Sequence, residues 1–268
     1  MTFFDAHNHL QDDRFAGRQA ELVAASRAAG VARMVVNGSC ETDWPQVAAL
    51  AREFPDLVVP SFGYHPWYLS ERTLRWRETL VEWLDQTPGA VIGEIGLDRW
   101  KPGLAYAGQE EVFLAQLQLA ADRNLAASIH CLQTWGRLLE LLRNSSRPAR
   151  GFLLHSYGGP VEMVAPLAKL GAHFSFPGYF MHERKARQRE TFKFVPADRL
   201  LIETDAPDQL LPDMANANPL ADPSNGKPLN HPASLPAVYQ FVAELRGVPL
   251  AELAAQVEAN FRRLFGGR

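Results

Sequence analysis

The sequence predicts a (β/α)8 barrel formed by one domain over residues 1–268. Short β-branched or aromatic segments alternate with longer amphipathic segments, which is typical of repeated βα units and a parallel sheet. Eight such short segments can be counted, and the 268-residue chain is close to the roughly 250 residues of a typical barrel of this class. An open doubly wound sheet is the structural alternative.

The predicted strands are short and apolar, and each is followed by a helical or loop segment. They cover residues 3–9, 33–38, 57–65, 90–98, 126–132, 151–156, 172–176 and 200–205. Amphipathic periodicity predicts helices over 18–29, 74–85, 109–123, 135–143, 233–245 and 250–264, with Gly30 and Gly89 where helix-ending glycines are expected. Residues 208–232 contain five prolines and no period, so we expect a long loop there, of a length that is usually functional or disordered.

The composition limits the class of protein. Hydrophobic residues make up 47% of the chain and 27 Lys+Arg stand against 30 Asp+Glu, which excludes disorder, collagen and coiled coil. A net charge of -3 means that any polyanion must be bound locally rather than by the whole surface. Two cysteines are too few for a disulfide framework, and neither a signal-peptide pattern nor a spanning apolar segment is present. We therefore expect a cytoplasmic protein with no membrane partner.

Acidic and imidazole side chains occur within or at the ends of the predicted strands. His7 and His9 are two residues apart in an apolar run, so on a strand both side chains lie on one face. For such a pair alone, local hydrogen bonding would be the ordinary interpretation. Glu94 lies in the apolar segment VIGEIGLD, where an unpaired buried carboxylate would be costly, so a cation should neutralise it.

The spacing of these residues indicates one site. Steps of 85, 36, 25 and 50 residues lead from His9 through Glu94, His130 and His155 to Asp205, in agreement with three, one, one and two βα units. We place all of them at the carboxyl ends of strands, where barrel enzymes build active sites. Four imidazoles and two carboxylates suit zinc, manganese or related divalent ions and exceed what one tetrahedral ion uses. We therefore predict two ions bridged by Glu94, with the ligands His7, His9, Glu94, His130, His155 and Asp205.

The motifs FFDAHNHL, GYHPWY, GEIGLD, IHC, LLHS and IETDAP, in this order, resemble those of the TatD family over nearly the whole chain. Members of that family are (β/α)8 metal-dependent hydrolases, usually described as magnesium- or zinc-dependent deoxyribonucleases. The resemblance implies one ion held by His7, His9, Glu94 and Asp205, and a second held by Glu94, His130 and His155.

The resemblance also implies roles for two further residues. His65 in GYHP would contact substrate, although a hydrogen-bonded loop histidine is the alternative. Glu203 would have a catalytic or supporting role, although a structural carboxylate is nearly as well supported. The chain departs from the family at Leu132, where many relatives have an arginine that can pair with a phosphate. The basic stretch 182–189 could meet phosphates, but a solvated helix face is favoured.

These observations predict a phosphodiesterase or deoxyribonuclease in which metal-activated water attacks and Asp205 takes the proton. Hydrolysis of an amide or ester, including aminoacyl-tRNA, is the alternative, because the same metals activate water against a carbonyl. A third interpretation, a non-catalytic binding protein, requires a broken site, yet all six ligand positions are filled. We expect DNA or another nucleic acid to be held at the barrel mouth, with no obligate protein partner.

Overall fold

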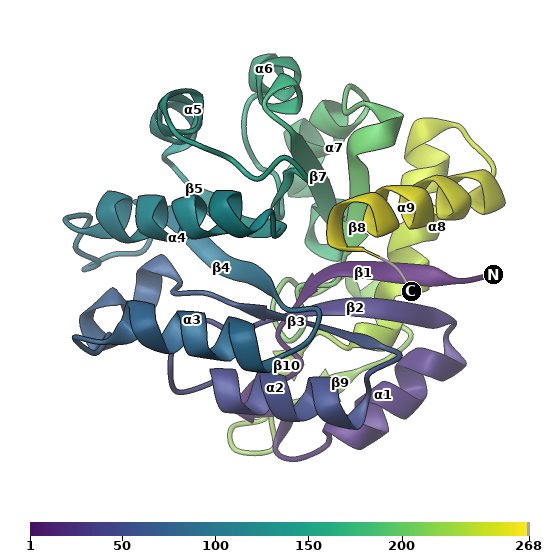
Figure 1. Cartoon of the computed structure of the whole chain (residues 1–268). Helices are drawn as coiled ribbons and strands as arrows, with labels where there is room; N and C mark the ends of the chain where they lie inside the picture. Colours follow the sequence, from purple (N-terminus) through teal and green to yellow (C-terminus); the bar gives the residue numbers. More distant parts are fainter. Residues whose placement is uncertain (267–268) are drawn as a thin grey trace.

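The computed structural model describes residues 1–266, so residues 267–268 of the predicted domain lie outside the described part. Eight parallel strands follow one another in sequence order around a barrel (Figure 1). They are β1 (Phe3–Asn8), β2 (Val31–Asn37), β3 (Val58–Phe62), β4 (Val91–Asp98), β5 (Ala127–Leu132), β6 (Phe152–Leu154), β7 (Ala172–Pro177) and β8 (Leu200–Glu203). This order confirms the predicted barrel. The doubly wound alternative is wrong, because the strand order of such a sheet reverses.

Backbone hydrogen bonds join the first and last strands just beyond their carboxyl ends. The amide of Asp205 donates to the carbonyl of His7 at 2.9 Å, and the amide of His9 donates to the carbonyl of Ala206 at 2.8 Å. The buried carboxylate of Asp5 accepts hydrogen bonds from the amide and the hydroxyl of Thr204, at 2.9 and 2.6 Å. These bonds bring Asp205 beside His7 and His9.

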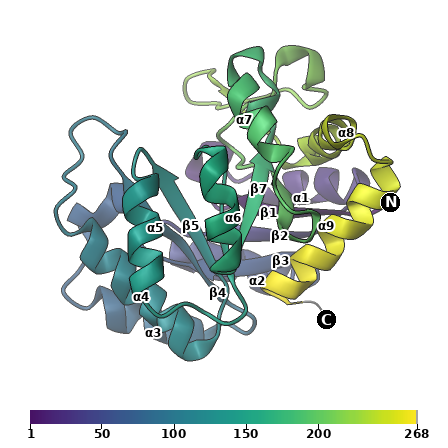
Figure 2. The ribbon, with the colours of Figure 1, turned by 90° about the horizontal axis from the view of Figure 1, so that it is seen from above.

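Helices form a layer outside the strands (Figures 1 and 2). They are α1 (Gln19–Ala28), α2 (Trp44–Glu53), α3 (Trp76–Gln86), α4 (Gln109–Arg123), α5 (Trp135–Asn144), α6 (Val164–Lys169), α7 (Ala186–Phe192), α8 (Leu235–Arg246) and α9 (Leu250–Phe265). No helix within residues 1–266 is both long enough and apolar enough to cross a membrane.

Several strands end before their predicted boundaries. β3, β6 and β8 stop two or three residues early, so His65, His155 and Asp205 lie on the loops that follow them. The chain turns at His65, whose ring nitrogen Nδ1 accepts a hydrogen bond from the amide of Trp67. These side chains nevertheless remain at the carboxyl end of the barrel.

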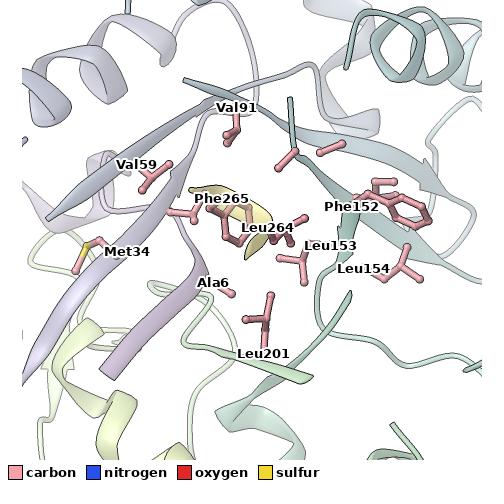
Figure 3. Close-up of a cluster of buried hydrophobic side chains, with 14 of the residues drawn as sticks. Ala6, Met34, Val59, Val91, Phe152, Leu153, Leu154, Leu201, Leu264 and Phe265 are labelled. Atoms are coloured by element: carbon pink, nitrogen blue, oxygen red, sulfur yellow. The ribbon is translucent and has the colours of Figure 1, made fainter. Parts of the chain in front are cut away.

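The carboxyl-terminal helix α9 covers the opposite end of the barrel. Figure 3 shows Leu264 and Phe265 among side chains from the surrounding strands. The ring of Phe261 packs against that of Phe4 at the start of β1, with 5.1 Å between ring centroids, and lies 5.0 Å from that of Phe265. These apolar contacts close the amino-terminal end, and the carboxyl end is left for the polar site.

The loop predicted over residues 208–232 contains a small hairpin that its lack of period did not predict. Strands β9 (Leu220–Ala221) and β10 (Pro228–Leu229) pair in antiparallel fashion. The carboxylate of Asp222 stabilises the turn between them by accepting hydrogen bonds from the amide and the hydroxyl of Ser224, at 2.8 and 2.6 Å. Local side-chain hydrogen bonds therefore specify this turn, and they leave no periodic pattern in the sequence.

Candidate metal centre

Two glycines on β4 position Glu94 in the middle of the barrel mouth. A Cβ atom at Gly93 would lie 2.8 Å from Oγ of Ser61, and one at Gly96 would strike the carbonyl oxygen of His130. Glycine at both positions lets β4 pack closely against β3 and β5. The Glu94 side chain between them is buried, with 3% of the residue exposed.

The two carboxylate oxygens of Glu94 contact different histidines. Oε2 lies 3.4 Å from Nε2 of His7 and 3.3 Å from Nε2 of His9. Oε1 lies 3.2 Å from Nδ1 of His130 and 2.8 Å from Nε2 of His155. A single carboxylate thus separates two pairs of imidazoles, which is the arrangement expected of a bridging ligand.

Asp205 lies with the first of these pairs. Its Oδ1 is 3.6 Å from Nε2 of both His7 and His9, and these two nitrogens are 3.3 Å apart. Their convergence agrees with the prediction that both imidazoles lie on one face. All six predicted ligands are therefore close together, at the carboxyl end of the barrel.

Three of the imidazoles have their outer nitrogen held by a neighbouring oxygen. The contacts, each of 2.8 Å, join His7 Nδ1 to Ser128 Oγ, His9 Nδ1 to the carbonyl of Asn37, and His130 Nε2 to Asp98 Oδ2. Such contacts fix the orientation of the ring and turn its other nitrogen toward the centre, as in known metal sites. The donor set and its support therefore fit divalent metal ions.

His65 differs from the other four imidazoles. Its Nδ1 accepts a hydrogen bond from the amide of Trp67 at 3.1 Å, so the neutral ring carries its proton on Nε2. That nitrogen lies 3.3 Å from Oε1 of Glu94. Burial lowers the pKa of His65 to about 4, so the ring is neutral at pH 7. In this state Nε2 donates a hydrogen bond and does not offer a lone pair to a metal.

In the metal-free protein, neighbouring carboxylates keep some of the clustered imidazoles protonated. Burial would lower the pKa of His9, but Glu94 and Asp205 raise it to about 9. Burial would likewise lower the pKa of His155, yet Glu94 and Glu203 raise it well above its ordinary value. A metal ion must displace these protons, so metal binding and protonation compete.

A hydrogen-bonded chain connects Asp205 to Glu203. The side-chain amide of Gln209 donates to Oδ2 of Asp205 at 2.5 Å and to Oγ of Ser156. The amide and hydroxyl of Ser156 donate to Oε1 of Glu203 at 2.8 and 2.5 Å, and Glu203 lies 3.7 Å from Nδ1 of His155. Burial raises the pKa of Asp205 to about 7.

Three members of this chain have left-handed backbone conformations, with φ of 45° at Ser156, 53° at Asp205 and 51° at Gln209. Strained residues of this kind cluster at functional sites. The sequence did not indicate Gln209, because its contact arises from the loop after β8 rather than from a periodic pattern.

The basic stretch after β7 is largely engaged within the protein. The guanidinium of Arg189 donates to the backbone carbonyls of Phe180, His182 and Glu183. Arg184 donates to the hydroxyl of Tyr179 at 3.2 Å. A cavity of about 380 Å³ separates this stretch from the loop after β8 and is lined by Tyr179, His182, Arg184, Asp208, Gln209 and Asp213, among others.

An eight-stranded barrel with clustered imidazoles and carboxylates at its carboxyl end defines a metal-dependent hydrolase. The family model described as TatD related DNase matches residues 4–266. The chain belongs to the TatD family.

Relatives of known name extend over the same length. A 3'-5' ssDNA/RNA exonuclease TatD from Erwinia tasmaniensis is 34% identical over 263 residues, with 98% of this chain and 99% of the relative covered. The protein of the same name from Escherichia coli K12 is 32% identical over 264 residues, with 98% of each chain covered. The solved structure of YJJV, a TatD homologue from Escherichia coli K12, has a TM-score of 0.89 and 26% identity, covering 99% of this chain and 98% of that one.

Proposed function

We propose that the protein hydrolyses phosphodiester bonds in single-stranded nucleic acid, with DNA as the first substrate to test, by means of two divalent ions. The observation that carries this proposal is the division of the Glu94 carboxylate between two pairs of histidines. The names of the relatives, 3'-5' ssDNA/RNA exonuclease, support the substrate class.

Residues of the centre divide into two sets of ligands. His7, His9, Asp205 and Oε2 of Glu94 would hold one ion, and His130, His155 and Oε1 of Glu94 would hold the other. Nitrogen and oxygen donors suit zinc, manganese or magnesium. When bound, such ions lower the pKa of water and polarise the phosphoryl oxygens.

Asp205 would accept the proton of the attacking water and pass it to the leaving oxygen. Gln209 holds Oδ2, which leaves Oδ1 turned toward His7 and His9. A carboxylate oxygen positioned in this way can act as a general base toward an attacking water.

His65 and Glu203 would have different tasks. The Nε2–H group of neutral His65 is placed to donate a hydrogen bond to a non-bridging phosphate oxygen. Glu203 is fully buried and accepts hydrogen bonds from Ser156 and Ser175 while lying beside His155. We therefore assign Glu203 a positioning role toward His155.

The test is a panel of substrates offered to the metal-loaded protein. We expect a single-stranded oligonucleotide to be cleaved faster than a closed circular duplex, because a stacked duplex cannot enter a barrel mouth without unstacking. Faster hydrolysis of aminoacyl-tRNA or a simple amide would replace the proposal with the carbonyl alternative, which the names of the relatives do not favour.

A further inference from the structure

One buried carboxylate ties an exposed loop to the candidate metal centre. Oδ2 of Asp98 contacts Nε2 of His130 at 2.8 Å and accepts a hydrogen bond from the indole N–H of Trp67 at 2.7 Å. Oδ1 of the same group accepts hydrogen bonds from the backbone amides of Trp100 and Lys101, at 2.6 and 3.0 Å. The loop between β4 and α4 is thus fixed relative to a predicted ligand.

The side chains of this loop are aromatic and cationic. Trp100 is 55% exposed, which is unusual for so large an apolar side chain. Nζ of Lys101 lies 4.1 Å from the ring centroid of Trp67, and the guanidinium of Arg99 lies 3.9 Å from that of Tyr106. Within residues 1–266 neither Arg99 nor Lys101 forms an ion pair with a carboxylate, so both charges are available to an anion.

The backbone at the start of this loop runs beside Leu132. Asp98 pairs with Leu132 in the register of β4 and β5, and the amide of Arg99 donates to the carbonyl of Leu132 at 3.1 Å. Leu132 ends its strand without a charge. Positive charge at this side of the mouth therefore comes from the neighbouring loop.

We propose that Trp100 and Lys101 bind a nucleotide next to the scissile bond of a single-stranded nucleic acid. The indole of Trp100 stacks on a base, and the ammonium group of Lys101 pairs with a phosphate. Stacking on an aromatic ring tolerates any base, which suits an enzyme without sequence preference. This inference rests on the proposed function, because it takes the substrate class from there.

The geometry allows these side chains to be changed without breaking the loop. Asp98 holds Trp100 and Lys101 through their backbone amides alone, so Trp100→Ala and Lys101→Ala keep both hydrogen bonds. A matched control exists in Lys193 and Phe194, an adjacent lysine and exposed aromatic. They lie between α7 and β8, hence toward the amino-terminal end of the barrel, away from the site.

The experiment compares these variants of the intact metal-loaded protein on single-stranded oligonucleotides and on bis(2,2,2-trifluoroethyl) phosphate, a diester that has no aromatic ring to stack on Trp100. Trp100→Ala should raise KM for oligonucleotides by about 5- to 100-fold with little change in kcat, and Trp100→Phe should recover most of the loss. Lys101→Ala should reduce the log-log salt slope of oligonucleotide binding by about 0.7, the value for one phosphate of a single strand. Hydrolysis of the small diester should be unchanged, as should both substrates with Phe194→Ala and Lys193→Ala.

An equal loss on both substrates would overturn the proposal, because it would show that the loop supports the centre rather than binding a nucleotide. Unchanged KM and salt slope in the two variants would also overturn it. Binding of a phosphorothioate oligonucleotide separates this inference from the proposed function. Binding that depends on Trp100 in a protein that cleaves no oligonucleotide would support the nucleotide site and refute the nuclease activity.

Discussion

Glu94 and His155 are in direct contact at the barrel mouth, with 2.8 Å between Oε1 of the carboxylate and Nε2 of the imidazole. The other oxygen of Glu94 lies 3.3 Å from Nε2 of His9. The two sides of one buried carboxylate therefore serve different histidines, and removal of Glu94 should have wider consequences than removal of any single imidazole.

Glu94→Ala should lose both metal ions. His155→Ala should lose mainly one, because of the two carboxylate oxygens of Glu94 it is Oε1 that His155 contacts. Elemental analysis of the purified variants measures this directly, with circular dichroism to verify folding and His182→Gln as a control outside the centre. Equal metal losses in the Glu94 and His155 variants would count against Glu94 as the bridge.

Asp205→Asn should lower turnover by about 100-fold or more, since an amide cannot accept a proton and is a weaker ligand. Initial rates on a single-stranded oligonucleotide under saturating metal measure the effect. If the variant turned over like the wild type, Asp205 would have no part in the proton transfer.

Gln209→Ala should lower kcat by about 10-fold and leave KM nearly unchanged, because the lost hydrogen bond frees the Asp205 carboxylate to rotate. A hydrogen bond to the ionised carboxylate favours that form, so its removal should also move the acid limb of kcat to higher pH. Gln118→Ala is a suitable control, because Gln118 is exposed on α4 and its side-chain amide donates a hydrogen bond to Asp122, outside the metal centre. A pure KM effect would contradict a positioning role for Gln209.

Metal binding should release protons between pH 7 and 8. The pKa of His9 is raised to about 9 and that of His155 well above its ordinary value, so both rings are protonated there in the metal-free protein. Titration calorimetry in buffers of different ionisation enthalpy counts the protons, and affinity should weaken as the pH falls. Metal binding without proton release would show that the cluster does not hold these protons.

The number of strands and the side chains that meet at the barrel mouth could be predicted from the sequence, because both depend on local rules. Alternation with period two places His7 and His9 on one face, and the barrel brings all strand ends to one edge. Gln209 and Trp67 could not be found this way. Gln209 contacts Asp205 within a loop that contains left-handed residues, and Trp67 contacts Asp98 from the loop after β3. Both contacts depend on loop paths that no single segment encodes.

His173 should limit stability in acid. It is fully buried on β7, and burial together with the charges of Arg199 and Arg263 lowers its pKa to about 4. Between pH 6.5 and about pH 4, His173 is protonated in the unfolded chain and neutral in the folded protein. The free energy of unfolding therefore falls as the pH drops through this range, by up to about 3 kcal/mol.

His173→Gln should remove this part of the pH dependence. Urea unfolding of the metal-free wild type and variant from pH 7.5 to 4.5 measures it, with His182→Gln as a control substitution at a less buried histidine. If the free energy of unfolding changed with pH in the same way in the wild type and in His173→Gln, His173 would have the same pKa in the folded and unfolded states.

The most direct test of the two-ion account is titration of the metal-free protein with manganese or zinc while cleavage of a single-stranded oligonucleotide is followed. We predict that activity is absent without metal and saturates at two equivalents per chain, because the carboxylate of Glu94 separates two sets of ligands. Saturation at one equivalent, or full activity in the presence of a chelator, would contradict the account.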